Sequence, residues 1–307
     1  MNVKQLSVKL DAKEYIHPEE KNFGPFYEVP GGWDYVVEPY KRPTITTSSY
    51  RKIKDYKLLS VINMTESSVV YSAIDSTNEQ YVAIKEIFDW FLFEKEVQAY
   101  RRVKKHPCVV EIYETFTIGY TGYIVMELLE GNLSSIMELL TLNDIKFIVK
   151  QLLYILHYLD RVGVVYFDLH PKNICYTTEN KMLQVRLVDF SMSELCSTVK
   201  DTNFQDYFRN NPCVKQTSQY RSYLDKIPGS HMDMWSLGCI LYEMIHDQVL
   251  FEEISDDNTH TENKNIIKGM FKHGVMMDTD DLTVQFIFHL LSRPTASAAL
   301  EHQWLNF

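Results

Sequence analysis

Residues 141–173 read TLNDIKFIVKQLLYILHYLDRVGVVYFDLHPKN, and this stretch decides the fold class of the chain. Thr141 or Asn143 suits the N-cap of a helix, and Gly163 suits its C-terminal stop. Between them, apolar side chains recur at helical spacing and form a single stripe: Ile145, Ile148, Val149, Leu152, Leu153, Leu156 and Leu159. The stretch therefore predicts a long amphipathic helix followed by a loop that combines an aspartate, a histidine and an asparagine.

The chain before this helix has the pattern of a small antiparallel sheet. Short β-branched and aromatic runs, separated by polar turns, predict three successive strands: YKLLSVI, VVYSAI and YVAIKEI. Phe91, Val97, Tyr100 and Val103 then recur at near-helical spacing. HPCVVEIYETF and GYIVMELL predict two more strands. The expected order is three strands, one helix and two strands.

The chain after the loop is predicted to be mostly helical. MDMWSLGCILYEMIH is apolar nearly all round, which is typical of a buried central helix, and shorter helices follow up to ALEHQWL. We therefore expect an α+β fold in two lobes: residues 55–130 form a small antiparallel sheet with one main helix, and residues 131–307 form a larger, mostly helical lobe. Residues 1–54 form an N-terminal extension rich in aromatics, glycine and proline, without a sustained period.

The composition excludes several classes of protein. With 307 residues and 45% hydrophobic content, the chain is long enough for a substantial core. Its 41 acidic and 31 basic residues give a formal charge of −10, so no overall basic field attracts nucleic acid or an anionic membrane. The 5 cysteines are widely spaced and form neither a zinc pattern nor a disulfide framework.

The start of the chain, MNVKQLSVKLDAKEYIH, has no apolar core of signal-peptide length. No apolar run approaches the roughly 18 residues of a membrane span. These features lead us to expect a cytoplasmic or nuclear protein without a membrane span.

Four short motifs occur along the chain, and the order in which they occur is informative. VAIK at 82–85 ends with a lysine on the third strand, DLHPKN at 168–173 follows the long helix, VDFS at 188–191 follows the next strand, and DMWSLGC at 233–239 opens the buried helix. With a β-lobe joined to an α-lobe, the chain resembles the protein kinases over residues 55–307. The resemblance implies the bilobal protein-kinase fold.

The resemblance also implies the residues of phosphoryl transfer. This reaction needs cations on the nucleotide phosphates, oxygen ligands for magnesium, and a carboxylate that orients the attacking hydroxyl. By resemblance, Lys85 contacts the α/β-phosphates of ATP and is held by Glu96. Asp168 is the catalytic base, and Asn173 and Asp189 bind two Mg²⁺ ions.

Each of these residues also has an ordinary structural explanation. A lone strand lysine is usually solvated, Glu96 has Glu94 as a rival and suits any helix-face charge, and Asp189 suits a turn cap. Their order along the chain favours the catalytic interpretation.

Adenine, by the same resemblance, lies in a pocket with Met126 at its back and the hinge at one edge. Such a pocket is lined by core side chains, so its members are ordinary core residues as well. The expected residues are Val70, Ala83, Met126, Glu127, Leu128, Leu129 and Cys175.

The glycine-rich loop of the family is missing. Aligning INMTESSVVYSA with that loop puts Asn63, Thr65 and Ser68 where the three glycines stand. Glycine lets backbone amides approach phosphate closely and adopt positive φ. We therefore expect a stiffer loop with a weaker grip on ATP.

Two aromatics precede the catalytic aspartate. Tyr166 and Phe167 replace the histidine and arginine usual in the family. Tyrosine is a tolerable packing change, but phenylalanine cannot pair with a phosphate. Switching by phosphorylation of Thr198 or Thr202 is therefore not expected, and the loop is expected to be set constitutively.

Three further positions concern the phosphate and the substrate. His170 replaces the lysine that steadies the transferring phosphate; it can donate a hydrogen bond but is charged only part of the time near neutral pH. Lys172 replaces a glutamate that contacts substrate arginines, which argues against a strongly basic consensus. Thr217 matches the threonine that bonds the catalytic aspartate in serine/threonine kinases.

The family's APE motif reads Ser222, Tyr223 and Leu224, so Arg293 has lost its acidic partner. An unpaired buried arginine is costly, so we expect Asp225 to replace that partner or the arginine to turn to solvent. Asp233 is expected to brace the backbone of the catalytic loop.

Two functions from different classes follow. The first is an ATP-dependent serine/threonine protein kinase, favoured because every group needed to hold metal and align the hydroxyl is present. The second is a pseudokinase that regulates or scaffolds a protein partner. A small-molecule kinase is a weaker alternative that rests on the DLHPKN loop. The scattered departures suit a rapidly diverging lineage, such as a viral kinase acting in a host cell.

Overall fold

The computed structural model describes residues 7–8, 51–179, 182–195, 218–224, 229–255, 257–272 and 281–306. The chain forms two compact units. The first comprises Met1–Val97, Val110–Glu130 and Thr178–Met182, and the second comprises Gln98–Val109, Gly131–Thr177 and Leu183–Phe307.

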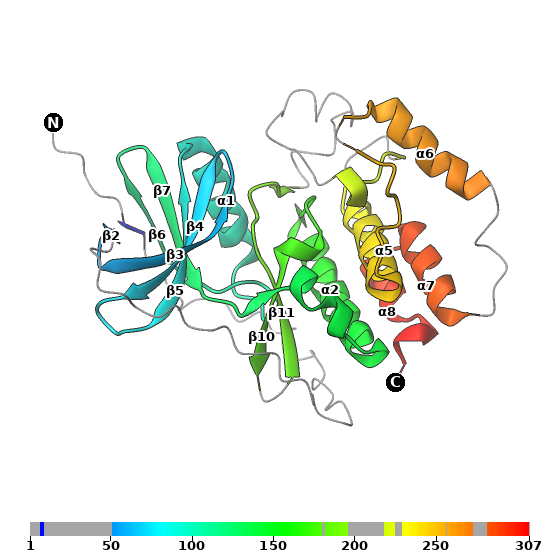
Figure 1. Ribbon diagram of the computed structural model, residues 1–307, viewed down its shortest axis with the longest axis horizontal. Helices are drawn as coiled ribbons and strands as arrows, with labels where there is room; N and C mark the ends of the chain where they lie inside the picture. Colours follow the sequence, from blue (N-terminus) through cyan, green and yellow to red (C-terminus); the bar gives the residue numbers. More distant parts are fainter. Residues whose placement is uncertain are drawn as a thin grey trace. The chain divides into compact units, whose positions relative to one another are not determined.

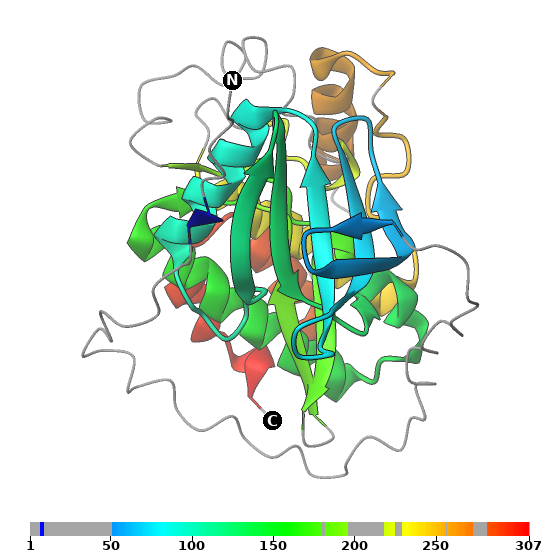
Figure 2. The ribbon, with the colours of Figure 1, turned by 90° about the vertical axis from the view of Figure 1, so that its left-hand side faces the viewer.

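The first unit is built on a 7-stranded antiparallel sheet in the order β1-β6-β7-β5-β4-β3-β2 (Figure 2). Its strands are β1 Ser7–Val8, β2 Lys52–Ile53, β3 Tyr56–Met64, β4 Ser68–Asp75, β5 Tyr81–Ile87, β6 Ile112–Ile118 and β7 Thr121–Glu127. One face of the sheet contributes most of a cluster of buried residues: Ile53, Tyr56, Leu58, Ala73, Val82, Ile84, Phe116, Tyr123 and Val125.

Helix α1, Trp90–Val103, follows β5, and its residues up to Val97 belong to the first unit. Asp89 begins it, because its carboxylate accepts hydrogen bonds from the backbone N–H groups of Phe91 and Leu92. Phe93 lies so close to Gly122 of β7 that a Cβ there would be 2.1 Å from the Phe93 ring. The expected stripe is therefore shifted at its start: Phe91 is 70% exposed, and Phe93 is buried instead.

The second unit is mostly helical (Figure 1). Helix α2 packs against α5 and α8, and α5 packs against α7. Thr141 and Asp144 form a reciprocal capping box at the start of α2, and Gly163 ends it at φ 74°. All seven residues of the predicted stripe are buried. The helices are α2 Leu142–Val162, α5 His231–His246, α6 His260–Lys272, α7 Leu282–Leu291 and α8 Ala296–Leu300.

Short strands hold the loops that follow α2. They form a 3-stranded sheet, β11-β10-β8, and a 2-stranded sheet, β12-β9. A 3₁₀ turn, Pro171–Asn173, lies between β9 and β10. The strands are β8 Gly131–Asn132, β9 Val164–Val165, β10 Ile174–Glu179, β11 Met182–Leu187 and β12 Glu194–Leu195.

The expected α+β fold class is confirmed, and so are the long helix and its caps. One strand begins later than expected. The run HPCVVEIYETF pairs in the sheet only from Ile112, because a turn from His106 to Val109 surrounds Pro107, which has no N–H to donate. Among the described residues, no helix is long and apolar enough to cross a membrane.

Candidate active site

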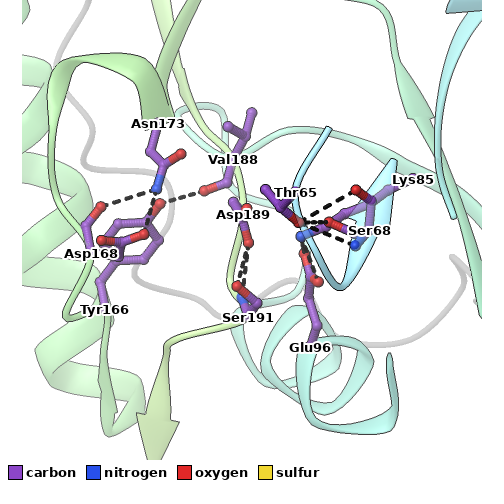
Figure 3. Close-up of polar contacts among 10 residues, drawn as sticks. All are labelled: Thr65, Ser68, Lys85, Glu96, Tyr166, Asp168, Asn173, Val188, Asp189 and Ser191. Carbon is purple, nitrogen blue, oxygen red and sulfur yellow. Dashed lines mark hydrogen bonds and ion pairs between the residues drawn. The ribbon is translucent and has the colours of Figure 1, made fainter. Parts of the chain in front are cut away.

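The first unit contains a buried ion pair. Lys85 lies on β5 and is only 5% exposed. Its Nζ donates to both carboxylate oxygens of Glu96 on α1, at 3.0 and 2.8 Å (Figure 3). A buried ammonium group requires such a partner, because burial without one is very costly. The pair therefore fixes one cation at a defined place beside the sheet.

The tip of the β3–β4 hairpin is closed by its own polar side chains. The Thr65 and Ser68 hydroxyls are 3.0 Å apart, and the Ser68 N–H donates to Thr65 Oγ1 at 3.1 Å (Figure 3). The Thr65 N–H also donates to the Ser68 carbonyl at 2.8 Å. Asn63, the remaining position that aligns with a glycine of the family's loop, is exposed and pairs with Val70 in the sheet. These bonds hold the tip in one conformation, which supports the expectation of a stiff loop.

The residues expected around adenine lie on β4, β5 and β7, on the segment after β7, and on β10. Ala83 and Met126 are direct partners across β5 and β7, and Val70 is the β4 partner of Lys85. Glu127 and Leu129 are half-buried. Cys175 lies on β10 in the second unit, where burial raises the pKa of its thiol to about 12. That thiol is therefore protonated near neutral pH.

The loop of residues 166–173, which follows β9 in the second unit, brings Asp168 and Asn173 into contact. Asn173 Nδ2 donates to Asp168 Oδ2 at 3.0 Å and to the Asp168 carbonyl at 3.1 Å (Figure 3). His170 Nε2 lies 3.5 Å from the same Oδ2. Asp168 Oδ1 is buried and accepts no hydrogen bond from any described residue. That oxygen suits an incoming hydroxyl group. Thr217, expected to bond Asp168, lies outside the described residues.

Asp233 braces the backbone of this loop, as predicted. Its two carboxylate oxygens accept hydrogen bonds from the N–H groups of Tyr166, at 3.0 Å, and Phe167, at 2.8 Å. Burial raises the pKa of Asp233 to about 7, against the effect of these two bonds. Phe167 has a φ of 68°, which is rare for a bulky residue, so the brace holds a strained backbone.

The segment after β11 is held by two hydroxyl groups (Figure 3). Ser191 Oγ donates to Asp189 Oδ1 at 2.6 Å, and the Tyr166 hydroxyl donates to the Val188 carbonyl. Phe190 is fully buried, with its ring centroid 5.0 Å from that of Tyr166 and 4.9 Å from that of Tyr100. Sequence reasoning missed both hydroxyl contacts. For Ser191 the signal was present, since VDFS departs from the D-F-G motif.

Asn173 and Asp189 are suitable ligands for magnesium. Asn173 uses its amide nitrogen for Asp168, so its carbonyl oxygen is the group left for a cation. Asp189 adds a carboxylate, and Mg²⁺ prefers such oxygens while keeping waters and substrate phosphates in its shell. The described residues contain no group of three or more His, Cys, Asp or Glu that could hold a metal. A site completed by phosphate oxygens does not need one.

His170 and Arg293 are two basic residues of the second unit whose interactions the sequence predicts to differ from those usual in the family. The His170 ring is tilted relative to the Tyr220 ring, with 6.3 Å between their centroids, and the Tyr220 hydroxyl donates to Glu243 at 2.6 Å. Burial raises the pKa of Glu243, and the Tyr220 bond opposes that shift. Arg293 is half-buried at φ 63°. Its expected partner Asp225, like Thr198 and Thr202, lies outside the described residues, so that pairing stays a prediction.

Comparison with known proteins gives a family. The family model described as protein kinase domain matches residues 56–305. The chain is 27% identical over 264 residues to the serine/threonine-protein kinase dkf-2 of Caenorhabditis briggsae, an alignment that covers 80% of this chain and 21% of that protein.

Two other relatives show similar identity. The calcium/calmodulin-dependent protein kinase type 1 of Caenorhabditis briggsae is 27% identical over 285 residues, or 85% of this chain and 74% of that protein. Mitogen-activated protein kinase 9 of Oryza sativa subsp. japonica is 30% identical over 243 residues, or 71% and 34%. The chain thus spans about a fifth of the first relative's length and about three quarters of the second's. None of these relatives bears on the expected viral origin.

Proposed function

The chain belongs to the protein kinase domain family, and from this premise we propose that it transfers the γ-phosphoryl group of ATP to serine or threonine hydroxyls of protein substrates. The matched relatives are protein kinases, and one is named as a serine/threonine-protein kinase. A small-molecule kinase is not proposed, since these relatives do not favour it.

The observation that supports catalysis most strongly is the state of Asp168. One carboxylate oxygen is fixed by Asn173, and the other is buried without a described hydrogen-bond donor. A buried carboxylate oxygen left in this state is costly unless a donor arrives during function. A substrate hydroxyl is a donor of the right chemistry. A domain that only binds partners does not need this arrangement.

The roles of the residues follow from their contacts. Lys85, fixed by Glu96, binds the α/β-phosphates of ATP, and Asn173 and Asp189 each offer an oxygen to magnesium. Asp168 accepts the hydrogen bond of the substrate hydroxyl through Oδ1, orients its attack and takes its proton. When bound, two Mg²⁺ ions held by Asn173 and Asp189 would supply positive charge that offsets the charge developing on the phosphates.

His170 is proposed to steady the transferring phosphate. Its Nε2 lies beside Asp168, so a protonated His170 would place a donor near the reacting group. A histidine is a weaker permanent cation than the lysine usual in the family, so we expect slower transfer. Thr217 remains the proposed partner of Asp168 from the segment outside the described residues.

Substrates of this enzyme are proposed not to need a strongly basic consensus. Lys172 is exposed and repels a basic residue near the loop. Glu243, a second acid besides Asp168 whose charge interacts with that of His170, already accepts the Tyr220 hydroxyl. A regulatory protein partner would replace phosphorylation as the means of control, because the buried Phe167 cannot bind phosphate.

A second candidate function is a pseudokinase that binds a partner without transferring phosphate. The closed β3–β4 tip favours it, because Thr65 and Ser68 bond to each other where glycines would bond phosphate. A single assay of phosphoryl transfer distinguishes the kinase from the pseudokinase.

The assay uses the purified chain with Mg²⁺, γ-labelled ATP and peptide libraries whose acceptors are serine, threonine or tyrosine, beside Asp168→Asn prepared in parallel. We expect label on serine and threonine peptides with the unchanged chain only. Label that persists in Asp168→Asn points to a contaminating kinase. No label with either protein, together with no thermal shift on adding ATP and Mg²⁺, would favour the binding module instead.

A further inference from the structure

We propose that Ser191 is a positioning residue for Asp189, and that its hydroxyl sets the affinity of the metal site. This inference rests on the proposed function, because it takes Asp189 to be a magnesium ligand. Nothing in the sequence motif requires it, since the motif D-F-G has a glycine without a side chain at this place.

The contact is short and doubled. Ser191 Oγ donates to Asp189 Oδ1 at 2.6 Å, and the Ser191 backbone N–H donates to the same oxygen at 3.2 Å (Figure 3). Two donors from one residue converge on one carboxylate oxygen, so they select one orientation of the Asp189 side chain. A glycine would supply only the longer of the two bonds.

Asp189 needs such support because of its backbone. Its φ of 54° lies in the left-handed region, which aspartate adopts more readily than most residues but still at a cost. The Tyr166 hydroxyl fixes the carbonyl of the preceding Val188 from the other side. The backbone is thus held by Tyr166 and the carboxylate by Ser191.

The hydroxyl is compatible with metal binding. An ionised carboxylate has about four lone-pair positions on its two oxygens, so Oδ1 can accept from Ser191 while the group ligates a cation. Hydrogen bonds to a ligand from outside the metal shell orient it, and losing one typically weakens metal affinity about 10- to 100-fold. We expect the lower end here, because the Ser191 N–H bond remains in any variant.

The chain offers a matched control in the same segment. Ser193, two residues along, donates its hydroxyl to the Tyr166 carbonyl at 3.4 Å and not to the Asp189 carboxylate. Ser193→Ala therefore removes an equivalent hydroxyl without touching the carboxylate. Ser191→Thr keeps the hydroxyl at the position of interest.

The test measures Mn²⁺, a spectroscopic substitute for Mg²⁺, bound to the full chain with a non-hydrolysable ATP analogue. Titration followed by electron paramagnetic resonance of free Mn²⁺ gives the dissociation constant, and thermal melting verifies that each variant is folded. We expect Ser191→Ala to weaken Mn²⁺ binding by about tenfold. Ser191→Thr and Ser193→Ala should bind like the unchanged chain.

The outcomes separate this inference from the proposed function. Equal Mn²⁺ affinity in Ser191→Ala and the unchanged chain overturns the role of Ser191 while leaving kinase activity intact. A comparable loss in Ser193→Ala also overturns it, since the effect would then be general to the segment. An unchanged chain that binds no Mn²⁺ with the analogue overturns the proposed function and this inference together.

Discussion

Tyr166 is the residue at which three supports of the catalytic loop meet. Its N–H is held by Asp233, its hydroxyl donates to the Val188 carbonyl, and its ring packs edge-on against Phe190. Burial also raises the pKa of its phenol well above the usual range. From the sequence alone this tyrosine was interpreted as a packing replacement. Its hydroxyl instead connects the loop of Asp168 to the segment of Asp189.

Tyr166→Phe removes that connection while keeping the ring. Losing a buried hydroxyl-to-carbonyl bond and leaving the carbonyl without it should lower the free energy of unfolding by about 1–3 kcal/mol. Urea denaturation measures the change. Tyr120→Phe is the control, because Tyr120 is 88% exposed and its variant should stay within about 0.5 kcal/mol of the unchanged chain. Equal stability of the two variants would contradict the account.

His106 makes the stability of the second unit depend on pH. Its ring is buried against Tyr158, 4.7 Å between centroids, and its Nδ1 accepts the Cys108 N–H at 3.1 Å. Burial lowers the pKa of His106 to about 4, from 6.5 in the unfolded chain. The unfolded state therefore binds a proton between these values while the folded state does not. The contribution of His106 to the free energy of unfolding is complete above pH 6.5 and is lost as the pH falls to about 4.

The size of this loss is about 3 kcal/mol for a shift of this kind. His106→Asn keeps an acceptor for Cys108 but does not titrate. Asp233 acts in the opposite direction, because burial raises the pKa of its carboxyl from 3.8 to about 7, so the stability that it contributes is lost as the pH rises between these values. The contribution of Asp233 is the same in His106→Asn and in the unchanged chain, so it cancels in the difference between their two profiles. We expect a flatter profile of unfolding free energy against pH in the variant, and parallel profiles would show that His106 is not responsible.

The residues that could be identified from the sequence are those whose roles follow from order along the chain. Lys85, Asp168, Asn173 and Asp189 were proposed through the resemblance to the protein kinases, which the order of the motifs and of the elements between them carries. The hydroxyl contacts of Tyr166 could not be predicted. They depend on backbone atoms 22 residues away and on the left-handed φ of neighbouring residues, which no local pattern encodes.

At the level of elements, the β3–β4 hairpin departs most from the family. Its tip is fixed by the Thr65 and Ser68 hydroxyls, and the backbone N–H groups of these two residues bond within the tip itself. Ser68→Gly removes one of these hydroxyls and restores access to positive φ. We expect the apparent affinity for ATP to tighten by about two- to fivefold, the equivalent of one modest hydrogen bond.

A fluorescent ATP analogue competed by ATP measures this change. Ser67→Gly is the matched control, because it adds a glycine one residue away and leaves the contact between Thr65 and Ser68 in place. The expected order of affinity is Ser68→Gly above the unchanged chain, with Ser67→Gly unchanged. Equal affinity in all three would mean that the closed tip does not limit nucleotide binding.

Elements with strong local signals were predictable and elements without them were not. Helix α2 has a capping box, an apolar stripe and a glycine stop, so both its ends could be predicted. Strand β1 has two residues, and it pairs with β6 at Phe116 and Thr115, more than a hundred residues along the chain. A strand that short has no period, so only the tertiary pairing defines it.

At the level of the whole molecule, each unit holds only part of the set of groups that we propose for phosphoryl transfer. The first has the cation, Lys85 with Glu96. The second has the base and the metal ligands, Asp168, Asn173 and Asp189. Neither set performs phosphoryl transfer alone, because the reaction needs both phosphate neutralisation and an oriented hydroxyl. The step that depends most on a single residue is removal of the proton from the substrate hydroxyl, which we propose for Asp168.

The most direct test is the rate of transfer from γ-labelled ATP to a peptide found in the library, compared between the unchanged chain and Asp168→Asn at saturating ATP and Mg²⁺. Asparagine keeps an acceptor for Asn173 but cannot take the proton. We predict that kcat of Asp168→Asn is about 10²- to 10⁴-fold lower than that of the unchanged chain, while its dissociation constant for ATP is unchanged. Equal rates of transfer by the two proteins would contradict this prediction.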